Sequence, residues 1–97
     1  MMLGTLTTEI RSKYPHPVKS ENNLNDPGCY CVGGACTLHA GYGIRFPLSN
    51  EIANAILKYN KSVNYEQAKV YGMCIVELND KGNFDGAWEI LNLALIY

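Results

Sequence analysis

Residues 83–95 read NFDGAWEILNLAL, and this segment carries the strongest helical periodicity in the chain. Its apolar side chains recur every three or four residues, which is the spacing of the buried face of an amphipathic helix. They are Phe84, Ala87, Trp88, Leu91 and Leu95. Residues 79–82, just before it, form a helix stop whose glycine suits a left-handed backbone. The pattern predicts a last helix that begins at Asn83.

Two earlier segments have the same periodicity. Asn64 can cap a helix, and Gln67 can return the bond in a capping box. The inner stripe of that helix is formed by Ala68, Tyr71, Ile75 and Leu78. Before it, Pro47 helps to open a helix that ends near Asn60, with Ser49 available as a cap. The inner face of this helix is formed by Ile52, Ala55, Ile56 and Tyr59.

A central helix is expected over residues 27–40, because Asp26 followed by proline is a favourable helix start. It is expected to stop at Gly41 or Gly43. The segment is apolar on nearly every side, which places it in the middle of a fold. Glycines inside a helix cost about 1 kcal/mol each relative to alanine, so another element is expected to cross residues 33–34 closely.

The first segment, residues 3–14, has Leu3, Leu6 and Ile10 at helical spacing. Its threonines also suit a strand, but a helix is favoured. Residues 15–26 are expected to form a long polar loop after the prolines at 15 and 17. Together these segments predict an all-α fold: one small domain over residues 1–97, a bundle of four to five helices around the glycine-bearing central helix.

Composition excludes several classes of protein. The chain has 97 residues, 47% hydrophobic and 18% charged, which is typical of a packed globular domain. Its net charge of −1 provides no basic field for a nucleic-acid polymer. The charge is uneven, because residues 1–70 hold seven basic and five acidic side chains whereas residues 71–97 hold one and four. A small phosphate-bearing ligand therefore remains compatible with the sequence.

The sequence also favours a cytoplasmic protein that does not enter a membrane. The N-terminus has no basic region followed by an apolar run, so a secretory signal is not expected. The longest uncharged stretch, residues 27–44, contains five glycines and a proline, which suits a buried helix with its loops better than a membrane span. The four cysteines are then expected to stay reduced and to act first as small hydrophobic residues.

Two short motifs carry a family resemblance. Cys31-Val32-Gly33-Gly34-Ala35 has the form Cys-x-x-Gly-Ala, and Ile75-Val76-Glu77-Leu78-Asn79-Asp80 precedes the closing helix. The chain from Cys29 to Leu95 resembles a family of small uncharacterised proteins from bacteria and their phages, although Tyr30 and Leu78 stand where that family often has tryptophan. The resemblance implies a helical fold and a bacterial or phage origin, and it implies no activity.

Candidate chemistry centres on the cysteines. Cys29, Cys31, Cys36 and His39 are all zinc-ligand types, but residues 29 and 31 would point about 200° apart on a helix, which is a poor zinc spacing. Cys29 or Cys36 with His39 would also suit a thiolate nucleophile. Asp80 and two further carboxylates after it could provide acid–base chemistry. Their positions at solvated helix ends explain these carboxylates better. We expect no metal, no cofactor and no catalytic residue.

A binding site is better supported. Seven tyrosines are a high share for this length, and tyrosine provides a flat apolar ring with a polar tip. Tyr42 and Arg45 lie in the loop after the central helix, close in sequence to His39, and Lys61 and Lys69 add positive charge further along the chain. Lys58 is a further cation available to an anion. These residues predict a site for a small anionic ligand.

The leading hypothesis is a non-catalytic helical binding module of bacterial or phage origin that forms a homo-oligomer and holds a small anionic ligand or a host protein. Oligomerisation would compensate for a small core, through the glycine-bearing helix or the Trp88 helix. One specific form is a phage counter-defence protein that sequesters a nucleotide-type signalling molecule. The alternatives are a cysteine-dependent enzyme or thiol sensor, and a protein-binding adaptor.

Overall fold

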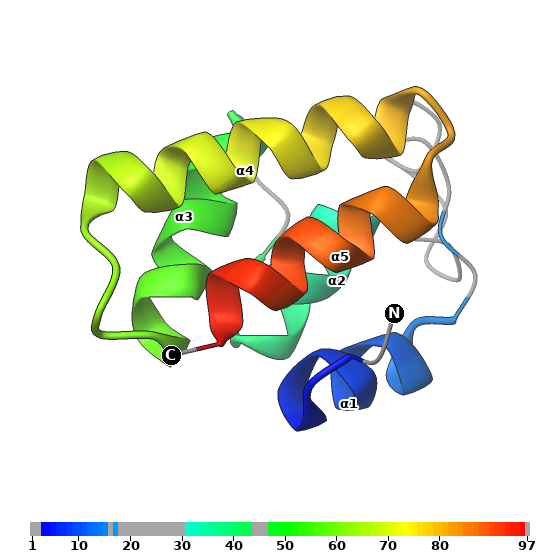
Figure 1. Cartoon of the computed structure of the whole chain (residues 1–97), viewed down its shortest axis with the longest axis horizontal. Coiled ribbons are helices and arrows are strands. Elements are labelled where there is room, and N and C mark those ends of the chain that lie inside the picture. The colour runs from blue at the N-terminus through cyan, green and yellow to red at the C-terminus, as the bar shows by residue number, and fades with distance from the viewer. Residues whose placement is uncertain (1–2, 16, 18–30, 44–46, 97) are drawn as a thin grey trace.

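Five helices form the described part of the chain in a computed structural model (Figure 1). The structure describes residues 3–15, 17, 31–43 and 47–96. The helices are α1 (Thr5–Lys13), α2 (Val32–His39), α3 (Leu48–Tyr59), α4 (Tyr65–Asp80) and α5 (Phe84–Leu95). The all-α prediction is confirmed, including the first helix. The predicted polar loop lies almost wholly outside the described residues.

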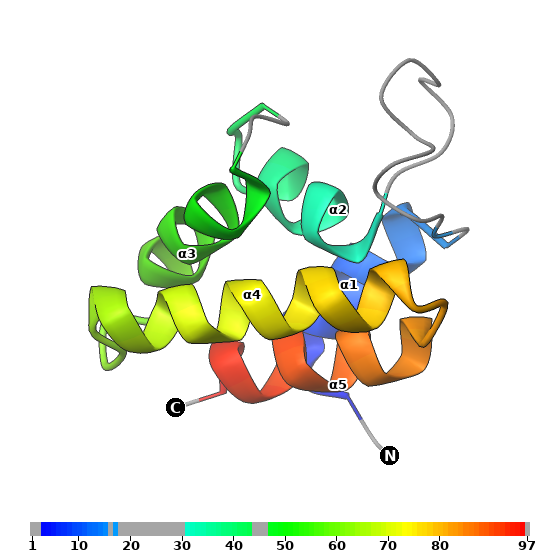
Figure 2. The same ribbon diagram turned by 90° about the horizontal axis from the view of Figure 1, so that it is seen from above.

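The short helix α2 lies at the centre of the arrangement and contacts each of the other four helices. Figure 2 shows α4 and α5 side by side, with α2 and α3 on the opposite side of α4. The first six residues of α2, Val32–Thr37, are all buried. A helix that is apolar on nearly all sides therefore lies in the core, as its sequence predicts. In the described residues, no helix is both long and apolar enough to cross a membrane.

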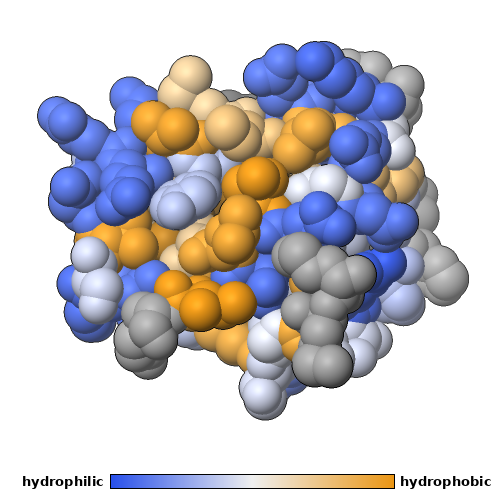
Figure 3. Space-filling view, viewed as in Figure 1, coloured by the Kyte–Doolittle hydropathy of each residue, from blue (hydrophilic) through white to orange (hydrophobic). Residues whose placement is uncertain are grey.

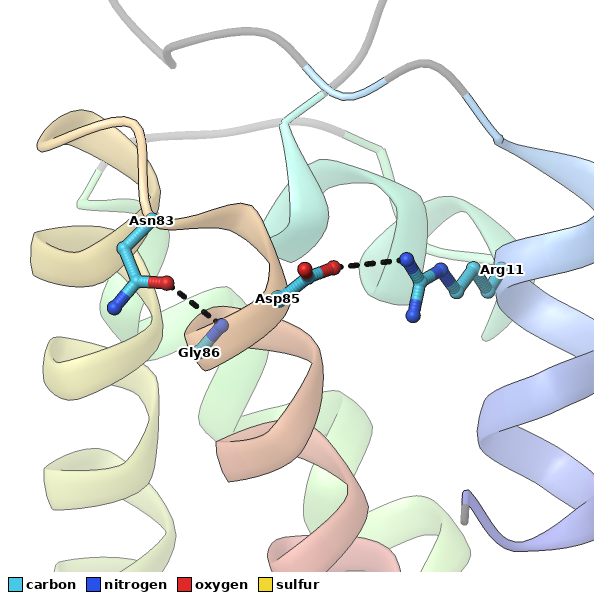
Figure 4. Close-up of polar contacts among 4 residues, drawn as sticks. All are labelled: Arg11, Asn83, Asp85 and Gly86. Carbon is cyan, nitrogen blue, oxygen red and sulfur yellow. Dashed lines mark hydrogen bonds and ion pairs between the residues drawn. The ribbon is translucent and has the colours of Figure 1, made fainter. Parts of the chain in front are cut away.

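The side chain of Trp88 is the largest fully buried one among the described residues. It comes from α5, whose predicted inner residues are also buried, apart from the partly exposed Phe84. On the α1 side, the Arg11 guanidinium lies 5.9 Å from the Trp88 ring centroid. Arg11 also forms an ion pair of 2.9 Å with Asp85 (Figure 4). This bridge joins α1 to the first turn of α5, where Asn83 caps the helix by accepting a hydrogen bond from the Gly86 N–H at 3.0 Å.

One predicted helix start and one predicted cap are wrong. Helix α2 begins at Val32 and not at residue 27, because Cys31 has an extended backbone and serves as the N-cap. Its Sγ accepts from the Gly34 N–H at 3.2 Å. Asp26 and Pro27 lie outside the described residues. Helix α3 opens at Pro47, as predicted, but Pro47 is itself the N-cap, and Ser49 lies within the first turn instead of capping the helix.

The predicted helix ends are confirmed where a local signal sets them. Asn64 caps α4 by accepting from the Gln67 N–H at 2.8 Å. Gly41 and Gly82 follow α2 and α4 with φ of 90° and 83°, a backbone conformation that favours glycine. After α4, the Asn83 N–H donates to the Leu78 carbonyl at 2.9 Å, which completes a Schellman motif.

Three buried asparagines join helices that are far apart in the sequence. Asn79 of α4 accepts from the Val32 N–H at 2.9 Å. Asn92 of α5 accepts from the Gly4 N–H, just before α1, at 2.7 Å. Asn60, which follows α3, donates to the Ala94 carbonyl at 2.8 Å. Each bond satisfies a backbone group at the end of another helix, where no intrahelical partner exists.

Two glycines allow α3 to approach its neighbours closely. A Cβ atom on Gly33 would lie 2.4 Å from Ile52 Cδ1, so the predicted crossing element is α3 of the same chain. A Cβ atom on Gly72 of α4 would lie 2.5 Å from the Ser49 carbonyl oxygen. The second contact was not predicted, because nothing local to Gly72 indicates it. The first shows that this glycine face is already covered within the monomer.

The Gly72 contact gives a stability prediction. Gly72→Ala should lower the free energy of unfolding by about 1–3 kcal/mol, because the added methyl group meets rigid backbone and forces α3 away from α4. At an exposed helix position, a glycine-to-alanine substitution should instead raise the free energy of unfolding by about 1 kcal/mol. Urea unfolding of this variant, compared with Val70→Ala on the exposed face of the same helix, measures the effect. A gain in stability for Gly72→Ala would contradict the close contact.

Candidate functional site

An open pocket of about 350 Å³ lies between the end of α2 and the outer face of α3. Its lining residues are Tyr42, Asn54, Leu57, Lys58 and Lys61. Asn54, Leu57 and Lys58 come from α3 and are spaced so that they share one face of the helix, and Lys61 lies two residues after the helix ends. The pocket combines an aromatic ring, two ammonium groups and an amide, and therefore suits an anion that also carries a flat ring.

The end of α2 fixes the position of Tyr42. The Gly41 N–H donates to the Leu38 carbonyl at 3.0 Å, and the Tyr42 N–H donates to the Thr37 carbonyl at 2.9 Å. This pair of bonds is a Schellman motif, and the positive φ of Gly41 allows it. The backbone of Tyr42 is therefore held to the helix, while its ring stays partly exposed beside α3.

Lys58 connects the two walls of the pocket. Its Nζ donates to the Ala40 carbonyl at the end of α2 and lies 5.5 Å from the centroid of the Tyr42 ring. The cation is thus held in place beside the aromatic ring by a charge-assisted hydrogen bond and a cation–π contact. Lys61 is exposed and supplies a second positive charge to the same pocket.

His39 belongs to a neighbouring network that ties α2 to α3 and α1. Its Nδ1 lies 2.8 Å from the Tyr59 hydroxyl, and its Nε2 lies 3.7 Å from Glu9 Oε1. Burial raises the pKa of Tyr59 to about 12, with smaller electrostatic effects of Cys36, Glu9 and Tyr42 in the same direction. The hydroxyl therefore stays protonated and donates to Nδ1 when His39 is neutral with its proton on Nε2. This network positions the end of α2 and does not line the pocket.

The structure brings together some of the predicted site residues and separates others. Tyr42 and Lys61 line the same pocket, and His39 lies nearby in its own network. Lys69 lies on the exposed surface of α4 and does not line the pocket, and Arg45 lies outside the described residues.

The sequence prediction does not include two residues that line the pocket, Asn54 and Leu57. Their spacing of seven and four residues before Lys61 is the signal that would have included them.

The described residues bear on the Cys36 form of the nucleophile hypothesis. Cys36 is fully buried, and burial raises the pKa of its thiol to about 12, so it stays a thiol at neutral pH. Both ring nitrogens of His39 face other partners, Tyr59 and Glu9. Within the described residues, no three His, Cys, Asp or Glu side chains are grouped to hold a metal ion. Cys29 lies outside those residues.

The buried thiol gives a chemical prediction. In the folded protein, Cys36 should resist iodoacetamide at mildly acidic and neutral pH, because the thiolate is the reactive form and burial disfavours it. Peptide mass spectrometry after alkylation locates the modified residues. The control is the same reaction in urea, where Cys36 becomes exposed and should react. Rapid labelling of folded Cys36 at mildly acidic pH would contradict the assignment and restore the nucleophile hypothesis.

No protein-family model, curated protein or solved structure matches this chain. The resemblance of residues 31–35 and 75–80 to small bacterial and phage proteins therefore stays a prediction from the sequence.

Proposed function

We propose that the protein binds a small anionic ligand that carries an aromatic ring, and that it holds the ligand without converting it. The observation that carries this proposal is the position of Lys58 beside Tyr42, with Lys61 in the same pocket. The ammonium groups would meet the anionic group of the ligand, and the Tyr42 ring would pack against its flat face. The side-chain amide of Asn54, which also lines the pocket, could form a hydrogen bond with a polar atom of the ligand.

A nucleotide-type molecule has these chemical features, since it joins phosphate to a flat base. Ligand pockets commonly range from about 300 to 1,000 Å³, and a pocket of about 350 Å³ suits a single nucleotide unit. In a phage protein, this function would be the sequestration of a host signalling nucleotide. The origin rests on the resemblance of residues 31–35 to bacterial and phage proteins, whereas the ligand class rests on the pocket.

Substitution of Lys61 tests the binding site. Lys61→Glu should weaken the binding of a nucleotide by about tenfold or more, because it replaces an attractive charge by a repulsive one. A panel of cyclic and linear nucleotides is screened by thermal shift, and isothermal titration calorimetry then measures the affinity of those that raise Tm. Tyr42→Ala should also weaken these ligands, through loss of the ring.

Two controls make this test specific. Lys13→Glu makes the same charge change on α1, outside the pocket, and should leave the affinity within about twofold. Tyr65→Ala removes another exposed ring, at the start of α4, and should also leave it unchanged. Failure of the whole panel to raise Tm, with no nucleotide in the purified protein, would contradict the proposal. Equal weakening by Lys13→Glu and Lys61→Glu would also contradict it.

A further inference from the structure

A second hollow lies on a different part of the surface, between the first turn of α3 and the second half of α4. Its volume is about 440 Å³. The apolar part of its wall is formed by Pro47, Leu48, Met73 and Val76, and the carboxylates of Glu77 and Asp80 line the same hollow. We call it the acidic groove. None of its residues lines the Tyr42 pocket.

The packing of α3 against α4 forms this groove. The Ser49 backbone lies directly against Gly72, so the start of α3 is held at the middle of α4. Helix α4 continues beyond that contact to Asp80 and presents its side chains next to the first turn of α3. The groove is therefore part of the rigid helical framework and needs no rearrangement to accept a partner.

The apolar side of the groove extends along the exposed face of α4. Val70 and Met73, one helical turn apart, are 58% and 54% exposed. Figure 3 shows more generally that hydrophobic residues gather in the middle of the face on which α4 and α5 lie. Large apolar side chains that are grouped and exposed mark interaction surfaces, and methionine adapts its shape to a partner.

The charge of the groove selects the partner. Glu77 and Asp80 are its two ionisable lining residues, and both are acidic. They occupy the last turn of α4, which contains no basic residue, so the negative end of the helix dipole adds to their field. Lys81 pairs with Glu77 at 3.0 Å, but both side chains are 66% exposed, and such a pair contributes little and is readily replaced.

We propose that the acidic groove docks a basic amphipathic helix of another protein. Its apolar residues would pack on Met73 and Val76, and its lysine or arginine side chains would pair with Glu77 in the negative field at the end of α4. Residues 70–80 of α4 span about 15 Å, which matches about three turns of a partner helix. The exposed apolar side chains of the described helices lie on α4 and α5, and α5 carries Asp85 and Glu89 but no basic residue. The charge of the groove therefore favours a different, basic protein as the occupant.

A designed peptide tests this proposal. A fourteen-residue helix of leucine and lysine, with leucine on one face, serves as the probe, and a peptide with glutamate in place of every lysine serves as its control. The lysine peptide should bind and shift the NMR methyl resonances of Met73 and Val76. Glu77→Lys should weaken this binding by about tenfold or more, and the glutamate peptide should not bind the wild-type protein.

Glu66→Lys is the matched control variant. Glu66 is exposed on the same helix and lies outside the groove, so this equal change of charge should alter the affinity by less than about twofold. The proposal would be overturned if Glu66→Lys and Glu77→Lys weakened binding equally. It would also be overturned if the NMR shifts were confined to other residues, or if the lysine peptide did not bind. Self-association of the free protein through Met73, measured by sedimentation and NMR dilution, would overturn it as well, because a second copy would then occupy the groove.

Discussion

The hydrogen bond from the Val32 N–H to the side chain of Asn79 fixes the start of α2, the helix that every other helix contacts. A helix of eight residues with two glycines has little stability of its own. Its first N–H groups are buried and have no acceptor within the helix. Asn79 and the Cys31 sulfur supply acceptors from outside. Without them, each unsatisfied buried group would cost about 1–3 kcal/mol.

The other end of α2 is held by side chains of α3, and this links the stability of the fold to the candidate site. Lys58 binds the Ala40 carbonyl, and Tyr59 binds His39. These two contacts, with the left-handed Gly41, determine where Tyr42 lies. The pocket is thus a consequence of how the central helix ends. It follows that the ammonium group that would meet an anion also stabilises the junction of α2 and α3.

The sequence predicted the features that depend on local signals. Helical periodicity identified four of the five helices described, and start and stop signals with an apolar composition identified α2. Asn64 and Gly82 set helix ends through partners only a few residues away. The start of α2 was beyond such reasoning, because Asn79 acts across 47 residues. The candidate site divides in the same way. Tyr42 and Lys61 follow from residue type, and helical spacing before Lys61 is the signal for Asn54. Which face of α3 meets Tyr42 depends on how α2 packs against α3, and the sequence alone does not show this.

Amide hydrogen exchange of Val32 in the folded protein tests the role of this hydrogen bond most directly. The Val32 N–H should exchange as slowly as amides inside the buried helices, although it lies at the first position of its helix. Asn79→Ala should remove this protection and lower the free energy of unfolding. Exchange of Val32 in the wild-type protein as fast as that of Glu66, an exposed first-turn residue of α4, would contradict the role of Asn79.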